Sequence, residues 1–357
     1  MKIAIAISGG VDSSVAALLL KQAGHDVFGL FMRNWDSFIN NDVLGNPNLN
    51  NPICPQEQDY NDALTVCHKL DIPLYRVDFV KEYWDNVFSY FLNELKKGRT
   101  PNPDVMCNKY IKFDVLLKHA KKLGAEKLAT GHYCQFIDKK LIKGVDLNKD
   151  QTYFLSQVKL KKFYDCLFPI GHLTKKEVRE IAKKNNLITS NKKDSTGICF
   201  IGERNFKKFL ENYLPNQVGD IVNIDKNKII GQHSGLMYYT IGQRRGLNIG
   251  GTKNKLFVVD KNLSLNQLLV AEGEQNNYLL SNKALIEDVN WLVKDIPTNC
   301  NAKFRYRGRD FPVDIEICNE KIIIKYQNVK AVTPGQACVF YDQNVCLGGG
   351  IIAKVYK

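Results

Sequence analysis

The stretch IAIAISGGVDSS at residues 3–14 decides the fold. Its unbroken apolar start predicts a buried strand, and the apolar stripe over residues 15–20 predicts a helix. Between the two lie Gly9 and Gly10, flanked by serines and an aspartate. Because glycine has no Cβ, an anion can approach the main-chain N–H groups of this turn, and the positive end of the helix dipole faces the same place. We therefore expect a phosphate-binding loop between the first strand and the first helix.

This loop is not a Walker A motif, because no Gly-Lys-Ser/Thr sequence follows its glycines. The backbone and the hydroxyls of Ser8, Ser13 and Ser14 must then hold phosphates without a loop lysine. The motif SGGVDSS resembles the PP-loop of ATP pyrophosphatases, which cleave ATP between the α and β phosphates and activate a carbonyl oxygen as its adenylate. An ordinary strand-to-helix turn is the alternative, and the complete motif speaks against it. The motif alone does not name the substrate.

The length and charge of the chain limit its class. With 357 residues it has room for two or three domains. Fifty Lys and Arg against 37 Asp and Glu give a formal charge of +13, which suits a polyanionic partner such as nucleic acid. The excess of lysine, with much asparagine and isoleucine, is also typical of an AT-rich genome, so charge supports RNA binding only modestly.

The apolar runs and the cysteines exclude several other classes. The apolar runs are too short for a secretory signal or a membrane span, so we expect a soluble, cytoplasmic protein. The ten cysteines include no C-x-x-C pair, so neither a disulfide framework nor a zinc site is expected. Most are expected to be small core residues.

The first half of the chain predicts an α/β domain with a parallel sheet. Further strands are expected at residues 26–34, 72–79 and 126–132. Strand–helix–strand units of this length form right-handed crossovers, and ligands of such sheets bind beyond the carboxyl ends of the strands. Met32 and Gly131 would then lie beside the nucleotide. His132 has two equally good interpretations: a core or surface histidine, or a residue with a role at this ligand-binding edge.

The second half of the chain has a different pattern of apolar residues and glycines. From residue 218 onward, short alternating segments separated by glycines predict small β domains, the last of them a barrel or sandwich. We expect three domains: a PP-loop ATP-binding catalytic domain of the adenine nucleotide α-hydrolase-like class at residues 1–200, a small central α+β domain at 201–275, and a C-terminal β-barrel at 276–357. Part of residues 165–190 is expected to pack with the central domain.

Two cysteine-containing stretches are candidates for chemistry. In TPNPDVMCNKYIKF, residues 100–113, two prolines predict an irregular segment up to Asp104, followed by a helix with Cys107 near its start. There the helix dipole and Lys109 would lower the thiol pKa and enrich the reactive thiolate. In DSTGICFIG, residues 194–202, a turn leads into a short buried strand with Cys199. Taken alone, each cysteine is better explained as a core residue.

Seven motifs together resemble the tRNA-specific 2-thiouridylase family, MnmA type. They are SGGVDSS, LFMRNW, NPDVMCNKYIKF, ATGHY, KDQTYFL, DSTGICFIG and GLMYYTIGQRRGL, with a weaker continuation through FRYRG. Their order and spacing cover residues 3 to about 250. The resemblance implies an enzyme that binds tRNA, adenylates the carbon-2 carbonyl oxygen of the wobble uridine with ATP and Mg²⁺, and replaces that oxygen with sulfur. Lysine, glutamate and glutamine tRNAs are the expected substrates.

The resemblance also implies roles for particular residues. The ATP-binding residues would be Ala6, Ile7, Ser8, Gly9, Gly10, Val11, Asp12, Ser13, Met32 and Gly131. The residues that contact the flipped target base would be Asn102, Pro103 and Asp104. The residues that hold the rest of the tRNA would be Lys149, Asp150, Gln151, Arg305 and Tyr306.

The family's sulfur chemistry assigns both cysteines. Cys199 corresponds to the persulfide carrier, Cys107 to its nucleophilic partner, and Asp104 is a candidate general acid or base. The two cysteines end as a disulfide, which a reductant resets. The chemistry agrees, because adenylation turns a poor oxygen leaving group into AMP, and thiol–disulfide exchange is the ordinary reaction of such a cysteine pair. A cysteine desulfurase or a relay protein would supply the sulfur, and a monomer is expected.

Other interpretations remain open. The nearest is another PP-loop ATP pyrophosphatase that acts on a different base or a small-molecule carbonyl, although no glutaminase region is visible. Another is a noncatalytic tRNA-binding protein, which would need neither thiol. The arginines of residues 244–246 and 305–309 are candidate phosphate contacts, against the alternative of solvated surface charge.

Overall fold

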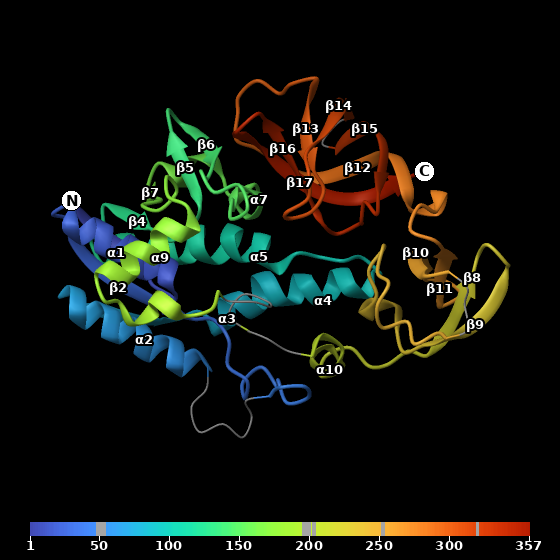
Figure 1. Ribbon diagram of the computed structural model, residues 1–357, viewed down its shortest axis with the longest axis horizontal. Helices are drawn as coiled ribbons and strands as arrows, with labels where there is room; N and C mark the ends of the chain where they lie inside the picture. Colours follow the sequence, from blue (N-terminus) through green and yellow to red (C-terminus); the bar gives the residue numbers. More distant parts are fainter. Residues whose placement is uncertain (48–54, 195–200, 202–204, 251–253, 319–320) are drawn as a thin grey trace.

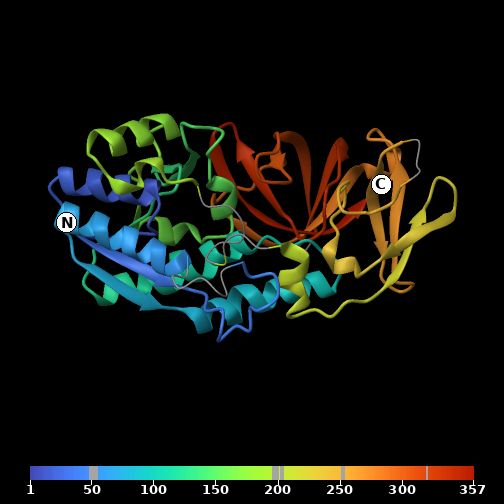
Figure 2. The same cartoon turned by 60° about the horizontal axis from the view of Figure 1, so that its bottom comes forward.

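The computed structural model describes residues 1–357 except 48–54, 195–200, 202–204, 251–253 and 319–320. It has three parts: an α/β part that contains the N-terminus, a β-barrel near the C-terminus, and a small sheet at the far end (Figure 1). Figure 2 shows the three parts in a row, with helices of the first part running beneath the others. This confirms the predicted fold class: a parallel α/β domain, a small central domain and a C-terminal barrel.

The α/β part is a five-stranded, all-parallel sheet in the order β3-β2-β1-β4-β7. Its strands are β1 (Lys2–Ala6), β2 (Asp26–Arg33), β3 (Leu74–Asp78), β4 (Lys127–Ala129) and β7 (Cys166–Leu167). The chain first adds strands on one side of β1 and then returns to add β4 on the other. The carboxyl ends of β1 and β4 therefore form the switch point where open α/β sheets bind ligands.

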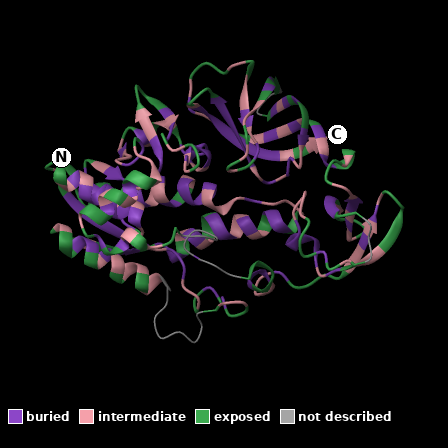
Figure 3. Cartoon of the chain, viewed as in Figure 1, coloured by how far each residue is buried: buried purple, intermediate pink, exposed green. Residues whose placement is uncertain are grey.

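Helices cover both faces of this sheet, because side chains alternate along each strand. Ile3, Ile5 and Val27 pack in one buried cluster with α1 (Val11–Gln22), α2 (Pro55–Leu70) and α9 (Lys175–Lys184). Ala4 and Leu30 face the other way, into the cluster with the helices of residues 80–122. Figure 3 shows the strands buried between the two helical layers. The unbroken apolar start of the chain is thus explained by burial on both faces.

A long helical region runs from the sheet towards the other two parts (Figure 1). Its members are α3 (Val80–Tyr83), η1 (Trp84–Phe88), α4 (Ser89–Lys96), α5 (Pro103–Met106), η2 (Cys107–Leu116) and α6 (Leu117–Lys122). The expectation of an irregular segment up to Asp104 was wrong, because the helix begins at Pro103. Proline is tolerated there since the first helical residue needs no N–H partner. Asn102 caps this helix, accepting from the backbone N–H of Asp104 at 3.1 Å.

The barrel consists of six antiparallel strands and is closed by pairing of its first and last strands. The strands are β12 (Leu280–Trp291), β13 (Asn299–Lys303), β14 (Phe311–Cys318), β15 (Lys321–Lys330), β16 (Ala337–Asp342) and β17 (Val345–Tyr356). A hairpin of β5 (Cys134–Ile137) and β6 (Lys140–Lys143) extends the same sheet, with Ile142 opposite Val345.

The small central sheet has the order β10-β11-β8-β9. Its strands are β8 (Gly219–Asn223), β9 (Lys228–His233), β10 (Leu256–Asn262) and β11 (Gln267–Glu272), preceded by α10 (Phe206–Glu211). Lys261 of β10 donates to the carbonyl of Gly98, just beyond the end of α4, at 2.8 Å. Burial lowers the pKa of Lys261 to about 8. The remaining short helices are α7 (Thr152–Leu155), α8 (Leu160–Phe163), η3 (Ile188–Asn191), η4 (Leu236–Tyr238) and η5 (Asn277–Leu279).

Candidate functional site

The PP-loop lies between β1 and α1 and is held by its own serines. Ser13 Oγ lies 3.2 Å from Ser8 Oγ and donates to the carbonyl of Gly10 at 3.1 Å. Ser14 Oγ donates to the same carbonyl at 2.8 Å. Gly9 adopts a φ of +71°, and a Cβ on it would lie 2.1 Å from the backbone oxygen of Asp59 in α2. Only glycine fits this position.

Gly131 and Met32 approach this loop from the neighbouring strands. A Cβ on Gly131 would lie 2.8 Å from the backbone nitrogen of Ser13. Met32 is buried near the carboxyl end of β2, beside β1. The structure thus brings the residues predicted to hold ATP to the switch point of the sheet. His132 is buried with its Nδ1 2.8 Å from Thr130 Oγ1, and burial lowers its pKa, which fits a core histidine.

The carboxylate of Asp12 is held by two side chains that the sequence analysis did not single out. It accepts from the Tyr133 hydroxyl at 2.7 Å and from Lys175 Nζ at 2.7 and 2.8 Å. Burial and the charge of Asp12 raise the pKa of Tyr133, so its hydroxyl stays protonated and donates. Tyr133 is the last residue of the ATGHY motif, from which no role was predicted for this residue, and Lys175 follows the capping residue Thr174 of α9.

Asp194 is the meeting point of three cations. It accepts from Lys149 Nζ at 2.6 Å, from Lys175 Nζ at 2.7 Å and from Arg179 Nη2 at 3.0 Å. Burial alone would raise the pKa of Asp194, but the hydrogen bonds from Lys149 and Lys175 outweigh it and lower the pKa to about 2. The carboxylate is therefore ionised at any physiological pH. Through Lys175 and Lys149, this carboxylate connects the PP-loop side of the site with the predicted tRNA-binding loop of the protein, residues 149–151.

Of the two candidate cysteines, the structure describes Cys107 only. Cys107 is fully buried in the apolar cluster that also contains Ile201. Cys199 lies outside the described residues, so its pairing with Cys107 stays a prediction. Lys109, expected to lower the thiol pKa, donates to Gln157 Oε1 at 3.0 Å. Near Cys107, Asn108 Nδ2 donates to the backbone carbonyl of Asp104 at 3.0 Å.

Hydrogen bonds from the surrounding backbone hold the loop of Lys149, Asp150 and Gln151. Asp150 is buried and accepts from the backbone N–H groups of Gly144 and Thr152, both at 3.2 Å. Burial raises the pKa of Asp150, and these hydrogen bonds oppose the rise. Gln151 Oε1 accepts from the backbone N–H of Tyr133 at 3.0 Å, which ties the loop to the strand end beside the PP-loop. Asp150 therefore shapes the loop, and its contact with tRNA stays a prediction.

The FRYRG turn of the barrel faces the same region. The ring of Tyr306 lies 4.4 Å from that of Phe154, which follows the Lys149–Gln151 loop. Burial raises the pKa of Tyr306, and the charges of Arg307 and Lys149 oppose it. Arg305 and Arg307 are exposed. The two predicted tRNA-binding segments, far apart in the sequence, thus meet on one side of the molecule.

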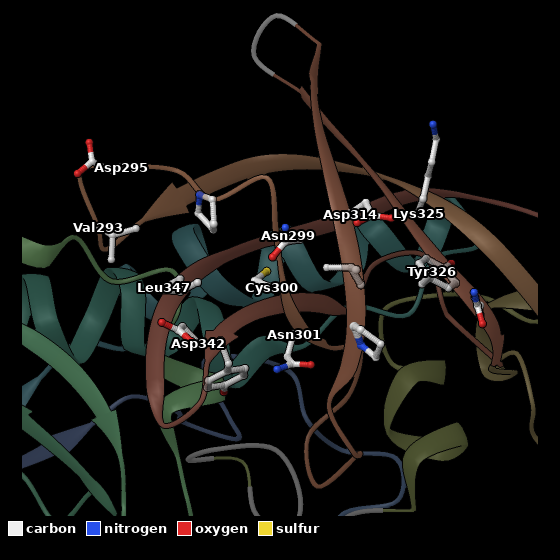
Figure 4. A pocket seen from close by; sticks show the side chains of 15 residues that line it. Val293, Asp295, Asn299, Cys300, Asn301, Asp314, Lys325, Tyr326, Asp342 and Leu347 are labelled. Carbon is white, nitrogen blue, oxygen red and sulfur yellow. The ribbon is translucent and has the colours of Figure 1, made fainter.

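Two of the hollows in the described part of the chain show that hollow size is a poor guide to the site. One of about 960 Å³ is formed by the barrel and includes Cys300, Asp314 and Tyr326 (Figure 4). None of the predicted site residues lines it. Another, of about 500 Å³, includes Arg244 and Lys255 at the central sheet. Hollow size alone therefore does not locate the site.

Two absences hold for the part of the chain that the structure describes. None of its helices is long and apolar enough to cross a membrane. Within the same residues, no group of three or more His, Cys, Asp or Glu side chains is arranged to hold a metal ion.

Comparison with known proteins gives matches along the whole chain. Family models described as the tRNA methyl transferase HUP domain, the tRNA methyl transferase PRC-barrel domain and the aminomethyltransferase beta-barrel domain match residues 1–203, 207–272 and 281–352. The solved U34-tRNA thiolase NcsA from Methanococcus maripaludis is 16% identical, with a TM-score of 0.35, covering 60% of this chain and 68% of that one.

The curated relatives are much more similar. The tRNA-specific 2-thiouridylase MnmA of Mycoplasma mycoides is 55% identical and covers 100% of this chain and 99% of the relative. That of Oceanobacillus iheyensis is 52% identical, with coverage of 100% and 96%. The descriptions of the family models name methyl transfer, whereas the relatives are named for thiolation. We follow the relatives, because they are more than 50% identical to this chain over nearly their full length. The chain belongs to the tRNA-specific 2-thiouridylase family, MnmA type.

Proposed function

We propose that this protein replaces the carbon-2 oxygen of the wobble uridine of tRNA with sulfur, consuming ATP and releasing AMP and pyrophosphate. The observation that carries the proposal is a complete PP-loop motif at the switch point of the sheet, in a chain that matches a 2-thiouridylase over 99% of that relative's length. Lysine, glutamate and glutamine tRNAs are the proposed acceptors. The alternative, another PP-loop reaction on a different base or carbonyl, is an outcome of the test below.

ATP is the proposed nucleotide, with its phosphates against the loop of Ser8, Gly9 and Gly10. The loop offers main-chain N–H groups without a lysine, and Gly131 leaves room beside Ser13. Mg²⁺ is held in proteins by one or two carboxylates together with substrate phosphates. The single carboxylate of Asp12 beside the loop fits this preference, and when bound the ion would offset the negative charge of the phosphates.

The target base is proposed to lie at the start of the helix that contains Cys107. Asn102 and Pro103 are fixed there by the cap, and Asp104 lies in the first helical turn. Extruding a base from the anticodon stack costs a few kcal/mol, roughly, so a preformed pocket edge helps to recover that energy. Adenylation then makes the carbon-2 oxygen leave as AMP. Asp104 is proposed to accept or donate the proton of this exchange.

Sulfur is proposed to arrive as a persulfide on Cys199. The thiolate of Cys107 attacks the sulfur of Cys199 that is bonded to carbon and releases the outer sulfur as hydrosulfide, which attacks carbon 2 and expels AMP. A disulfide between the two cysteines forms, and two external thiols, or one dithiol, reduce it by two electrons and become a disulfide themselves. The scheme is supported by the cluster that Cys107 shares with Ile201, because Ile201 is only two residues from Cys199 in the sequence.

The wider context is proposed on the same basis. A cysteine desulfurase or a relay protein supplies the persulfide, and the enzyme acts as a cytoplasmic monomer. Lys149, Gln151, Arg305 and Tyr306 are proposed to hold the tRNA, since they meet on one side although they come from two parts of the fold.

The proposed division into domains is 1–200, 201–275 and 276–357. The β5–β6 hairpin belongs to the first of these segments but pairs with β17 of the third. Limited proteolysis is therefore expected to cut the links of the central domain before it separates the first domain from the barrel.

The proposal is tested by mass spectrometry of nucleosides from tRNA incubated with the protein, ATP, Mg²⁺, cysteine and a cysteine desulfurase. The expected product is 2-thiouridine, and its formation requires ATP and fails with Cys199→Ala. Sulfur on a different nucleoside would show that the target is another base. AMP without any thiolated nucleoside would favour the alternative PP-loop reaction.

A further inference from the structure

A cluster of three cations and two carboxylates lies between the PP-loop and the predicted tRNA loop. Lys175 Nζ donates to both oxygens of Asp12 at 2.7 and 2.8 Å and lies 2.7 Å from Asp194 Oδ1. Asp194 in turn accepts from Lys149 at 2.6 Å and from Arg179 at 3.0 Å. Four segments of the chain meet here: the start of α1, the loop before α7, the start of α9, and the segment after η3.

The bonding capacity of Lys175 is used up. An ammonium group has three N–H donors, and three carboxylate oxygens surround this one. Its side chain is 12% exposed, so water screens its two ion pairs less than it screens pairs on an open surface. A lysine shared between two carboxylates in this way moves towards whichever of them becomes less well neutralised.

Arg179 does not respond in the same manner. Its guanidinium also donates to the backbone carbonyls of Ser190 at 2.8 Å and Lys192 at 3.0 Å, which fix its position. Lys149 has Asp194 as its ion-pair partner and belongs to the predicted tRNA-binding loop, residues 149–151. Its side chain is 25% exposed and that of Arg179 is 30% exposed, so the backbone hydrogen bonds of Arg179, and not exposure, distinguish the two cations. Of the three cations at Asp194, Lys149 is therefore the one that an RNA phosphate can compete for.

We infer that Lys175 is a positioning residue that couples tRNA binding at Lys149 to nucleotide binding at Asp12. When a phosphate of the RNA takes Lys149, Asp194 loses one cation and attracts Lys175 more strongly. Lys175 then withdraws from Asp12, whose carboxylate becomes available to the Mg²⁺ that accompanies the nucleotide. This inference rests on the proposed function for the roles of Lys149 and Asp12, and it adds the coupling between them.

The coupling is reciprocal, because it is a difference in binding free energy between two sites. If tRNA tightens nucleotide binding by some factor, the nucleotide tightens tRNA binding by the same factor. Coupling of this kind typically amounts to about fivefold or more. An enzyme arranged in this way commits ATP only when its RNA substrate is in place.

The experiment measures the affinity of the full-length protein for Mg²⁺ and α,β-methylene-ATP, an analogue that cannot be cleaved between these phosphates. Calorimetry is run with and without a saturating unmodified tRNA transcript. The wild-type protein is expected to bind the analogue at least about fivefold more tightly with tRNA. In Asp194→Asn and Lys175→Met this ratio is expected to fall below about two, and Lys175→Arg, which keeps the cation, should restore part of it.

The matched control is Lys176→Met. Lys176 is the next residue of the same helix, but its side chain is 87% exposed and lies 3.9 Å from Glu180, away from the cluster. Its ratio should equal that of the wild type. Melting temperatures with and without the analogue show whether each variant is folded and still binds.

Two results would overturn the inference. One is a wild-type affinity for the analogue that tRNA does not change. The other is a Lys175→Met protein in which analogue binding weakens equally with and without tRNA, since Lys175 would then be only a phosphate ligand. A wild-type protein that binds neither ligand would instead contradict the proposed function itself.

Discussion

Gly9→Ala tests directly whether the PP-loop must keep its conformation, because the structure defines which atom an added methyl group would contact. A Cβ at this position would lie 2.1 Å from the backbone oxygen of Asp59, whereas contacts under 3.0 Å are essentially never seen. The loop or the start of α2 must therefore move by roughly 1 Å. Alanine at the φ of +71° also costs about 1 kcal/mol of backbone strain.

The expected result is a loss of catalysis that exceeds the loss of stability. A misplacement of about 1 Å in a catalytic site lowers the rate on the order of 100-fold. We therefore expect the rate of AMP formation, measured with radiolabelled ATP and saturating tRNA, to fall by roughly this factor. Thermal unfolding should show a protein that is destabilised but still folded.

Gly24→Ala is the matched control for strain. Gly24 has a similar φ of +77°, but a Cβ on it would have no heavy atom within 4 Å. This variant should lose about 1 kcal/mol of unfolding free energy and keep its rate of AMP formation. If Gly9→Ala formed AMP at the wild-type rate, the close contact with Asp59 would not constrain the loop, and the placement of the nucleotide would be refuted.

Three further predictions concern sulfur, tRNA and pH. Cys199→Ala should abolish 2-thiouridine formation while filter binding still detects tRNA; loss of tRNA binding would contradict a role confined to sulfur transfer. Charge reversal at Arg305 and Arg309 should weaken tRNA binding and reduce the slope of its salt dependence by roughly one to two, and an unchanged slope would place the phosphates elsewhere. Lys261, whose pKa is lowered to about 8, binds fewer protons in the folded than in the unfolded state from about pH 8 upward. Unfolding free energy should therefore rise with pH between about 8 and 10.5 in the wild type relative to Lys261→Met, and parallel profiles for the two proteins would contradict a buried lysine with a lowered pKa.

The nucleotide end of the site could be predicted because its determinants are local. An apolar strand, two glycines and an apolar helix are adjacent in sequence, and each feature has one simple structural consequence. The glycine requirement at Gly9 follows from a positive φ and a close approach, which the motif indicates directly. The parallel sheet follows from helices and strands that alternate along residues 1–130.

Other features could not be predicted because they depend on context. The hairpin of β5 and β6 turns at Asp138 and Lys139, both with positive φ, as in a type I′ turn. Lysine is unusual in such a turn, so the local residue pattern does not indicate where this hairpin turns. The helix start at Pro103 was missed for the opposite reason, since two prolines were interpreted as helix breakers although one of them occupies the first helical position.

The cluster around Asp194 was missed because its members are distant in sequence. Lys149, Lys175 and Asp12 each have an ordinary local explanation, and only the folded chain shows that one ammonium group is shared by two carboxylates.

The pairing of the β5–β6 hairpin with β17 has a consequence for how tRNA is held. Because Ile142 pairs with Val345, the β5–β6 hairpin, which follows β4 of the parallel sheet, is hydrogen-bonded to the barrel. Gln151 ties the tRNA loop to Tyr133 at the nucleotide edge, and the ring of Tyr306 packs on Phe154 just beyond that loop. If the tRNA backbone binds at the barrel and the target base lies near Asp104, as proposed, hydrogen-bonded strands and packed rings set the distance between the two. We expect such an arrangement to select an RNA whose anticodon loop has the right shape, and to leave the choice among anticodons to contacts with the base itself.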